Sequence, residues 1–438
     1  MTYPGCINVM KSIRIIALVT FSVFAFSVTD AQYCDGKRFT EFPIFTDFEV
    51  DSAMNVIYGN AVNWVGVPED LKANIYYPKI GIDTLEKRPF ILELHSGSFL
   101  TGSMDELNFE SKEFAKRGYV AATIDYRVGW NYLPDCGGDT VSSAMAIYRA
   151  MQDCHAALRY FVANASLYRI DTAYIFIGGN SAGAYTTVDL AFVNQDEIDG
   201  RYPWCQPSLG NLNASGNNLT DTFTLKGLFH NWGSIIDIDF LQPEDAIPMI
   251  AFAGALDTIS HIDSGYYENC TNYPFMWGTR AIYNRLVSFG ECADLTVKED
   301  GYHGVYNLTE AQNLFRVGRA CCFFKSLFCN DCVTFYSTDS IPATCSNNYI
   351  RTSVSEPGRA SPVEIFPDPA SSLITITSKD HEFYDSWVSI VDSLGRVVWI
   401  SRLTGSSVTL DVSDFAEGVY FVGFNRGHRA KLLINHKS

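Results

Sequence analysis

Short apolar runs alternate with amphipathic stretches along the chain as far as about residue 335. Runs rich in β-branched and aromatic residues, which predict strands, lie at 55–64, 71–77, 89–95, 119–126, 174–177, 225–231, 247–253 and 294–298. The run 89–95 is almost wholly apolar, which is typical of a central parallel strand covered on both faces. Apolar residues spaced three and four apart predict helices at 105–117, at 142–164 and directly after residue 181. Strands that alternate with helices predict the α/β class, here a mostly parallel sheet with helices on both faces.

The pattern changes near residue 336. Residues 336–361 are polar and poor in helix formers, which predicts a linker. Beyond them, apolar residues recur at every second position in about six short runs joined by Gly, Ser and Asp, which predicts a small β-sandwich. We therefore expect a first domain at 32–335, a linker at 336–361 and an all-β domain at 362–438.

Residues 1–31 have the pattern of a secretory signal peptide. Lys11 and Arg14 precede an apolar run over 15–28, and Thr29-Asp-Ala offers a small-residue cleavage site. The apolar run is short for a bilayer span, and no other run approaches that length. We expect a secreted protein without a stable membrane span; the alternative is a retained membrane anchor.

The cysteine content agrees with export. The chain has twelve cysteines, which is many for a cytosolic enzyme and typical of an oxidising compartment. Loss of Cys6 with the signal leaves an odd number, so at least one cysteine stays free if the others pair internally. Cys321, Cys322, Cys329 and Cys332 form a cluster whose last pair fits half of a zinc site, but the first pair does not supply a second half. We therefore favour disulfides over zinc.

Residues 174–185, YIFIGGNSAGAY, join a predicted strand to a predicted helix, and within them Gly179-Asn-Ser-Ala-Gly fits G-x-S-x-G. In that motif the serine occupies a strained strand-to-helix turn, and the glycines are needed because side chains there would clash with the neighbouring backbone. The turn exposes the serine oxygen at the carboxyl end of the strand. Ser181 is therefore the predicted nucleophile.

Serine is a poor nucleophile at neutral pH and needs a base, which this motif takes from a histidine further along the chain. Three histidines qualify: His230, His261 and His303. His303 lies in a glycine-bracketed loop directly after the last predicted strand of the sheet, which is where the base must come from. His230 lies inside a predicted strand, and His261 follows Asp257, the predicted acid, too closely. We predict His303.

The acid of the triad should follow the strand before that of His303. Asp257 comes after the run 247–253 and a Gly-Ala turn, where its carboxylate can accept the imidazole Nδ1–H. Asp237 and Asp239, from the preceding loop, are the alternatives, and Asp300 is too near His303 in sequence to be chosen.

Backbone N–H groups should stabilise the oxyanion that forms during acyl transfer. One comes from the residue after the nucleophile, Ala182, and the others from the loop after the third strand. That loop reads His95-Ser-Gly-Ser-Phe, so Gly97 and Ser98 are the candidate donors. His95 then braces the loop.

The stretch 194–224 is rich in Asn, Gly, Ser and Asp and interrupts the alternation just after the predicted nucleophile helix. Loop extensions beside a site shape substrate choice. We expect this insert to lie over the mouth of the site; the alternative is a plain surface excursion.

Together these motifs resemble the carboxylesterase and lipase branch of the α/β-hydrolase family. Five stand in the order of that family: His95-Ser-Gly-Ser-Phe, Asp125-Tyr-Arg, Gly179-Asn-Ser-Ala-Gly, Gly254-Ala-Leu-Asp and Gly301-Tyr-His-Gly. The resemblance covers about residues 55–328. It implies an α/β-hydrolase fold in which Ser181, Asp257 and His303 are the catalytic triad.

The same resemblance implies an oxyanion hole made by Gly97, Ser98 and Ala182. The loop of the family is usually His-Gly-Gly, whereas here the second position is Ser96. This departure leaves the assignment of donors within the loop open.

The tail resembles the C-terminal sorting domain of proteins exported by the type IX system of Bacteroidetes. The motifs are Val363-Glu-Ile-Phe-Pro-Asp-Pro-Ala, Val391-Asp-Ser-Leu-Gly-Arg-Val-Val and Phe415-Ala-Glu-Gly-Val-Tyr-Phe-Val. The resemblance implies passage through the periplasm, recognition of the tail by the secretion machinery, removal of the tail on export, and a final place outside the cell or on its surface.

We therefore predict a secreted serine carboxylic-ester hydrolase that uses an acyl-enzyme on Ser181 and no metal or other cofactor. The resemblance implies short acyl or polysaccharide-linked esters, such as acetyl and feruloyl esters, as substrates. A serine peptidase, a non-catalytic hydrolase-like binding protein and a tail that binds carbohydrate through Trp387 and Trp399 are the alternatives. The net charge of −17 argues against nucleic acid as a partner, because nucleic acid needs a basic patch.

Overall fold

The computed structural model describes a large α/β region and a small β region. The described residues are 33–34, 38–338, 345, 363–378, 386–392, 397–403, 405–424 and 429–436. The predicted signal peptide and most of the predicted linker lie outside them.

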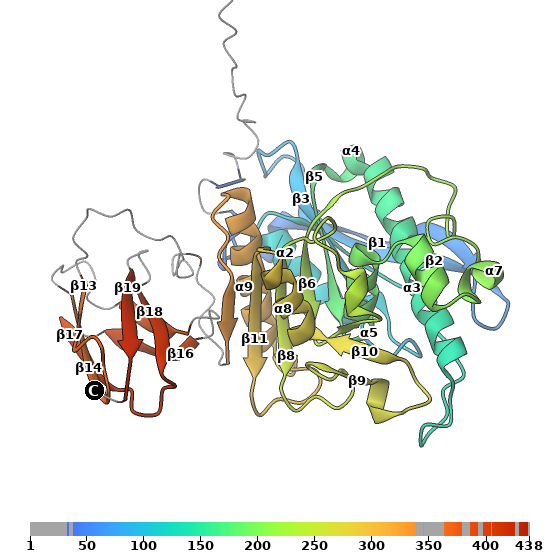
Figure 1. Ribbon diagram of the computed structural model, residues 1–438. Coiled ribbons are helices and arrows are strands. Elements are labelled where there is room, and N and C mark those ends of the chain that lie inside the picture. The colour runs from blue at the N-terminus through green and yellow to red at the C-terminus, as the bar shows by residue number, and fades with distance from the viewer. Residues whose placement is uncertain are drawn as a thin grey trace, which may run out of the picture.

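The large region is built on a nine-stranded sheet with the order β1-β2-β4-β3-β5-β6-β8-β11-β12 (Figure 1). Its strands are β1 (Val50–Val62), β2 (Pro68–Pro78), β3 (Arg88–Leu94), β4 (Val120–Ile124), β5 (Ile170–Asn180), β6 (Leu225–Asn231), β8 (Met249–Gly254), β11 (Ala293–Lys298) and β12 (Phe335–Ser337). β2 pairs antiparallel with β1 and β4, and every pairing from β4 to β12 is parallel. The predicted α/β class is confirmed, and the carboxyl ends of the parallel strands meet at one edge.

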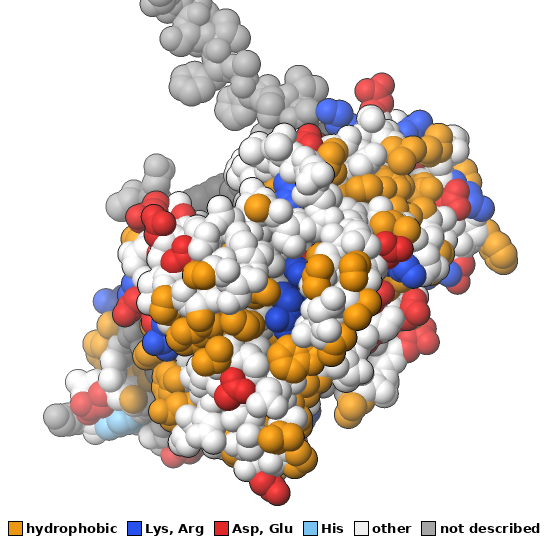
Figure 2. Space-filling model, turned by 90° about the vertical axis from the view of Figure 1, so that its right-hand side faces the viewer, with side chains coloured by type: hydrophobic (Ala, Val, Ile, Leu, Met, Phe, Trp, Pro, Cys, Tyr) orange, Lys and Arg blue, Asp and Glu red, His pale blue; other side chains and the backbone are white. Residues whose placement is uncertain are grey.

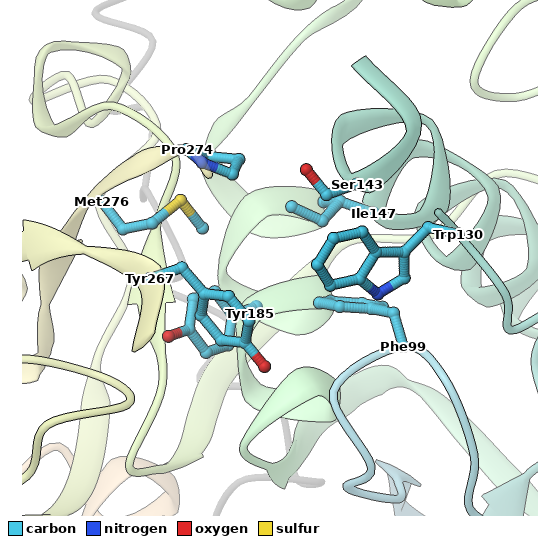
Figure 3. A pocket seen from close by; sticks show the side chains of 8 residues that line it. All are labelled: Phe99, Trp130, Ser143, Ile147, Tyr185, Tyr267, Pro274 and Met276. Carbon is cyan, nitrogen blue, oxygen red and sulfur yellow. The ribbon is translucent and has the colours of Figure 1, made fainter. Parts of the chain in front are cut away.

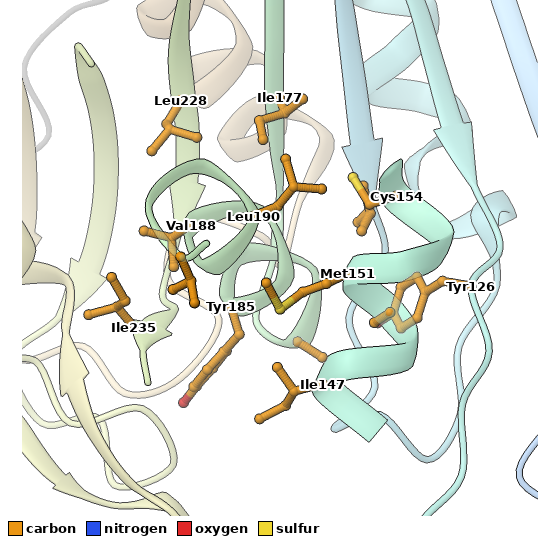
Figure 4. Close-up of a cluster of buried hydrophobic side chains, with 14 of the residues drawn as sticks. Tyr126, Ile147, Met151, Cys154, Ile177, Tyr185, Val188, Leu190, Leu228 and Ile235 are labelled. Carbon is orange, nitrogen blue, oxygen red and sulfur yellow. The ribbon is translucent and has the colours of Figure 1, made fainter. Parts of the chain in front are cut away.

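Helices cover both faces of this sheet, as the apolar central strands require. α3 (Thr140–Ala163), α5 (Ala182–Phe192) and α8 (Thr279–Ser288) share one core, and α2 (Asn108–Lys116) and α9 (Glu310–Phe328) share the other. Side chains alternate between the two cores along each strand. In β5, Ile177 packs into the first core, where Figure 4 shows it next to Leu190. Phe176 packs into the second core, where its ring stacks on that of Phe324 with 4.1 Å between the ring centres.

The remaining elements of the large region are short. They are η1 (Asp47–Glu49), η2 (Met104–Leu107), α4 (Ala165–Tyr168), α6 (Gln195–Arg201), α7 (Cys205–Leu209), β7 (Ser234–Ile235), η3 (Ile238–Phe240), β9 (Ser264–Tyr266), η4 (Tyr267–Asn269) and β10 (Phe275–Gly278). β7, β10 and β9 form a separate three-stranded sheet beyond the carboxyl edge of the main one.

The last strand of the main sheet corrects one predicted boundary. β12 includes Tyr336 and Ser337 and pairs in parallel with β11. The predicted linker 336–361 therefore begins inside the sheet. Three residues are too few to show a strand pattern in the sequence, and β12 is set by its pairing with β11.

The insert 194–224 does not lie over the mouth of the site; it packs along α3 and also contacts β1 and the segment after β4. The Asn217 amide donates to the backbone carbonyls of Tyr58 and Ala156, at 2.9 Å each. Arg159 of α3 donates to the carbonyl of Ser215 at 2.7 Å. The polar residues of the insert thus satisfy polar groups along the helix. Ile198, Cys205 and Leu212 of the insert are buried in the first core, so the alternative of a plain surface excursion does not describe it either.

Four disulfides are present among the described residues, so the preference for disulfides over zinc is confirmed. The pairs are Cys34–Cys329, Cys136–Cys270, Cys292–Cys332 and Cys322–Cys345. Cys322, Cys329 and Cys332 of the predicted cluster thus belong to three different bridges. Cys321 is free and buried, as are Cys154 and Cys205.

The small region consists of two antiparallel sheets. One has the order β13-β14-β17 and the other β16-β15-β18-β19. The strands are β13 (Val363–Phe366), β14 (Leu373–Ser378), β15 (Ser386–Val391), β16 (Val397–Leu403), β17 (Ser407–Asp411), β18 (Gly418–Phe424) and β19 (Arg429–Ile434). Ile376 of one sheet and Ile390 of the other share a single apolar core. The predicted all-β sandwich is confirmed.

The surface of the large region mixes side chains of every kind. On the face shown in Figure 2, apolar side chains form several separate patches between acidic and basic ones. None of the helices within the described part of the chain has the length and apolar character that a membrane span needs.

Candidate active site

Ser181 occupies the turn between β5 and α5, in a backbone conformation that side chains rarely adopt. Its φ is 51° and its ψ is −118°. A Cβ added at Gly183 would lie 2.1 Å from the Leu94 carbonyl oxygen, and one at Gly179 would lie 2.6 Å from it. Both glycines of the motif are thus required by the close approach of β3. The strain of the turn holds the serine at the carboxyl edge of the sheet.

The structure places His303 within hydrogen-bond distance of both Ser181 and Asp257. His303 Nε2 lies 2.8 Å from Ser181 Oγ, and His303 Nδ1 lies 2.8 Å from Asp257 Oδ2. The carboxylate can only accept, so Nδ1 donates to it and Nε2 is left to accept from the serine. This is the geometry of a nucleophile, a base and an orienting acid.

The Asp257 carboxylate is itself fixed. Its Oδ1 accepts the backbone N–H groups of Ile259 at 2.8 Å and Ser260 at 2.9 Å. Its side chain is 1% exposed, whereas that of His303 is 21% exposed. The acid is therefore held rigidly while the base remains within reach of a substrate.

The other candidate histidines lie elsewhere. His230 is in β6 and is buried, and burial lowers its pKa to about 4. The His261 ring packs against Gly265, where an added Cβ would lie 2.1 Å from it. The structure gives neither ring a hydrogen bond to Ser181.

The alternative acids have other partners. Asp237 caps η3 by accepting the N–H of Asp239, and Asp300 pairs with Lys298. None of these three carboxylates bonds to His303 in the described structure.

The loop after β3 has an unusual backbone that turns it back on itself. Gly97, Ser98 and Phe99 have φ values of 113°, 56° and 58°. A Cβ at Gly97 would lie 2.0 Å from the Thr101 carbonyl oxygen, so only glycine fits there. Within the described part of the chain, the N–H groups of Gly97, Ser98 and Ala182 make no hydrogen bond. They are free to donate to a ligand.

Ser96, where the resembled family has glycine, anchors the loop. Its hydroxyl donates to Glu106 at 2.8 Å, and its N–H donates to the same carboxylate at 3.2 Å. The His95 ring stacks on Tyr126 at 4.2 Å, and the Tyr126 hydroxyl donates to the His95 carbonyl at 2.9 Å. Burial lowers the pKa of His95, so the ring stays neutral and braces the loop as expected.

Sequence reasoning missed a buried arginine behind the site. Arg316 of α9 donates from Nη1 to the Asn180 side chain at 3.3 Å and from Nε to the Tyr306 carbonyl at 3.0 Å. Asn180 precedes the nucleophile, and Tyr306 lies in the loop that carries His303. The guanidinium also pairs with Glu110 of α2. One side chain thus ties the nucleophile turn to the loop of the base.

No local signal in the sequence could have identified this arginine. It stands in a stretch with no motif, and an arginine in a helix is normally expected at the surface. Its partners come from segments far apart in the chain and become neighbours only in the fold.

The fold and the elbow define an α/β-hydrolase. Comparison with known proteins agrees: residues 73–230 match the family described as BD-FAE, and residues 364–435 match the secretion system C-terminal sorting domain. The α/β region thus has the α/β-hydrolase fold and is similar to an esterase family, and the tail is similar to a secretion sorting domain. Such a sorting domain directs the protein to the cell surface or the extracellular space.

Curated relatives match part of the α/β region. Gut esterase 1 of Caenorhabditis elegans is 30% identical over 122 residues, which are 27% of this chain and 20% of that protein. Phenmedipham hydrolase of Pseudarthrobacter oxydans is 32% identical over 106 residues, 24% of this chain and 20% of that protein. Neuroligin-like protein glit-1 of Caenorhabditis elegans is 30% identical over 119 residues, 27% of this chain and 15% of that protein. The chain spans a fifth or less of the length of these relatives.

Solved structures are similar to this chain at lower sequence identity. Thermogutta terrifontis esterase 2 phosphorylated by paraoxon has a TM-score of 0.42 and 19% identity, with 61% of this chain and 90% of that chain covered. Esterase B from Lactobacillus rhamnosis has a TM-score of 0.42 and 14% identity, with 69% of this chain and 91% of that chain covered. Such scores add nothing to the assignment of function.

Proposed function

We propose that this protein is a secreted serine carboxylic-ester hydrolase in which Ser181 is the nucleophile, His303 the general base and Asp257 the orienting acid. The proposal is supported by the two hydrogen bonds of the His303 ring, one to each partner at 2.8 Å. It is also supported by the strained turn that carries Ser181.

In the proposed mechanism Ser181 Oγ attacks the ester carbonyl carbon while His303 Nε2 takes the hydroxyl proton. The resulting imidazolium is stabilised by Asp257. When the tetrahedral intermediate collapses, the bond to the alcohol breaks and His303 returns the proton to the departing oxygen. Water then attacks the acyl-enzyme by the same route, which releases the acid and restores Ser181.

Gly97, Ser98 and Ala182 are the proposed oxyanion donors. The unused N–H groups of these residues support the proposal, as does the place of Ala182 at the positive end of α5. Loss of one such donor typically raises the barrier by about 3–4 kcal/mol.

We propose that residues 32–335, extended through Ser337, form the catalytic domain and that residues 362–438 are recognised by the secretion machinery. Residues 1–31 are the proposed signal peptide, and those after Ser337 up to 361 the linker. The proposed substrates are short acyl esters or the acetyl and feruloyl esters of polysaccharides. The names of two relatives, an esterase and a hydrolase, agree with this reaction type.

The test is initial rates on nitrophenyl acetate, butyrate and octanoate, methyl ferulate and acetylated xylan, for the native protein and for Ser181→Ala. We expect turnover that is lost in the variant, together with labelling of Ser181 by an alkyl phosphonate. Full activity in Ser181→Ala would refute the proposed nucleophile. A folded native protein with no turnover would direct attention to peptide substrates and then to a non-catalytic role.

A further inference from the structure

A small apolar cavity lies beside the proposed site. Tyr185, which lines it, follows Ser181 by one turn on the same face of α5, and Phe99 directly follows Ser98 of the oxyanion loop. The Tyr185 hydroxyl lies 2.6 Å from Ser260 Oγ, in the loop that holds the acid. Residues that line the cavity (Figure 3) are thus next to the nucleophile turn, next to the oxyanion loop and in contact with the loop of the acid.

The cavity has room for little more than one small group. Its volume is about 20 Å³, and a space of about 10–15 Å³ on this measure holds one water, which is close in size to a methyl group. The walls are aromatic and apolar, so a methyl group fits their chemistry and a polar group does not.

The walls on the two sides come from segments far apart in the sequence. Figure 3 shows Trp130 and Phe99 on one side and Met276 and Tyr267 on the other. Trp130 belongs to the segment 125–139 between β4 and α3, whereas Met276 and Tyr267 belong to β10 and η4. The size of the cavity thus depends on how these two segments are held together.

One disulfide joins the two segments. Cys136 lies six residues after Trp130, and its partner Cys270 lies between Tyr267 and Met276. The two segments are in close contact near this bridge, because a Cβ at Gly138 would lie 2.9 Å from the Tyr273 ring. Exposed hydrogen bonds, such as that from Thr140 Oγ1 to the Asn272 carbonyl at 2.7 Å, supplement the bridge.

We propose that the cavity receives the acyl group of the substrate and that the Cys136–Cys270 disulfide determines acyl selectivity by fixing the distance between the two walls. This inference rests on the proposed esterase function. It specifies acetyl as the preferred acyl group, since a butyryl or feruloyl group exceeds the space between the walls.

The first test enlarges the cavity from the side away from the oxyanion loop. In Met276→Ala, kcat/KM for nitrophenyl butyrate relative to nitrophenyl acetate should rise about tenfold or more, because a hydrophobic pocket discriminates by roughly that factor per methylene. An unchanged ratio would show that the acyl group binds elsewhere.

The second test removes the bridge. The Cys136→Ser/Cys270→Ser variant should show a raised butyrate-to-acetate ratio, and Cys292→Ser/Cys332→Ser, which opens a bridge next to β11 and β12, should keep the native ratio within about twofold. Tyr273→Phe is a milder variant in case the bridge is needed for folding, since the Tyr273 hydroxyl donates to the Leu133 carbonyl at 3.2 Å between the same segments.

The outcomes separate the claims. If Met276→Ala raises the butyrate-to-acetate ratio but neither the cysteine variant nor Tyr273→Phe changes it, the role of the disulfide is refuted. Binding of the acyl group in the cavity would still stand. Efficient hydrolysis of butyrate or ferulate by the native protein would refute the acetyl preference but not the esterase function. Absence of any ester hydrolysis by the native protein would refute the proposed function itself.

Discussion

The α/β region and the β-sandwich tail bury different kinds of groups. Three of the largest fully buried side chains in the described structure are arginines, and all three, Arg88, Arg159 and Arg316, lie in the α/β region. The described core of the tail consists of apolar side chains such as Ile376 and Ile390. Burial of a charged group costs free energy that ion pairs and hydrogen bonds offset only in part.

Backbone strain is distributed in the same way. Non-glycine residues with positive φ are found from Phe39 to Asn330, and the described tail has none. They include Ser98 and Ser181 of the proposed site, and Cys136 beside the cavity. The region that carries the proposed site thus contains strained conformations that are absent from the described tail, and this difference can be tested.

The largest effect should come from the acid of the triad. In Asp257→Asn the amide cannot stabilise the imidazolium and can leave His303 in the wrong tautomer, so kcat should fall about 10⁴-fold. Initial rates on nitrophenyl acetate check this. The urea unfolding curve is the control, and a loss of rate explained by unfolding would contradict the role.

The next effect should come from Arg316→Met. Removal of the guanidinium leaves Glu110 buried without its partner, which typically costs about 3–5 kcal/mol of unfolding free energy. Because Arg316 contacts both Asn180 and Tyr306, kcat in the fraction that remains folded should fall while KM changes little. The matched control, Arg280→Met, breaks the half-exposed pair with Asp263 and should cost at most about 1 kcal/mol.

A tail substitution should separate the two regions. Ile390→Ala removes buried apolar atoms and should destabilise the sandwich by about 2–4 kcal/mol without altering kcat for ester hydrolysis. Hydrogen exchange of the tail strands and initial rates measure the two results. Thr409→Ala, at an exposed position, is the control. Loss of hydrolysis in Ile390→Ala would show that the regions are coupled.

The last effect concerns pH and is small near neutral pH. Burial lowers the pKa of His155 and His230 to about 4, below the unfolded value near 6.5. Above pH 6.5 both states leave these rings neutral; below it only the unfolded state takes up the protons. As the pH falls from 6.5 to 4, each ring should therefore reduce the free energy of unfolding by up to about 1.4 kcal/mol per pH unit. His230→Leu should have a shallower slope than the native protein in urea unfolding across this range.

The proposed triad could be named from the sequence because its requirements are local. The two glycines around Ser181 report a close backbone approach, and His303 and Asp257 each follow a strand in the expected chain order. The alternation of apolar runs likewise predicted the central strands, because both faces of each are covered.

The rest could not be predicted because it depends on contacts between distant segments. Arg316 acquires its role only when α9 packs beneath the nucleophile turn. The position of the insert 194–224 is set by donors on α3 such as Arg159, which no pattern within the insert reveals. β12 is too short to be detected without its partner strand.

The bond between Cys34 and Cys329 imposes an order of events on the chain. The two cysteines are 295 residues apart, and Cys136 and Cys270 lie between them. A chain that is synthesised and exported from its N-terminus presents the Cys34 thiol long before its partner arrives, while other thiols are already available. Correct pairing thus requires either that Cys34 remains reduced until α9 is complete or that early bonds are exchanged. This bridge fastens the first described segment to the end of α9, the last described helix of the α/β region.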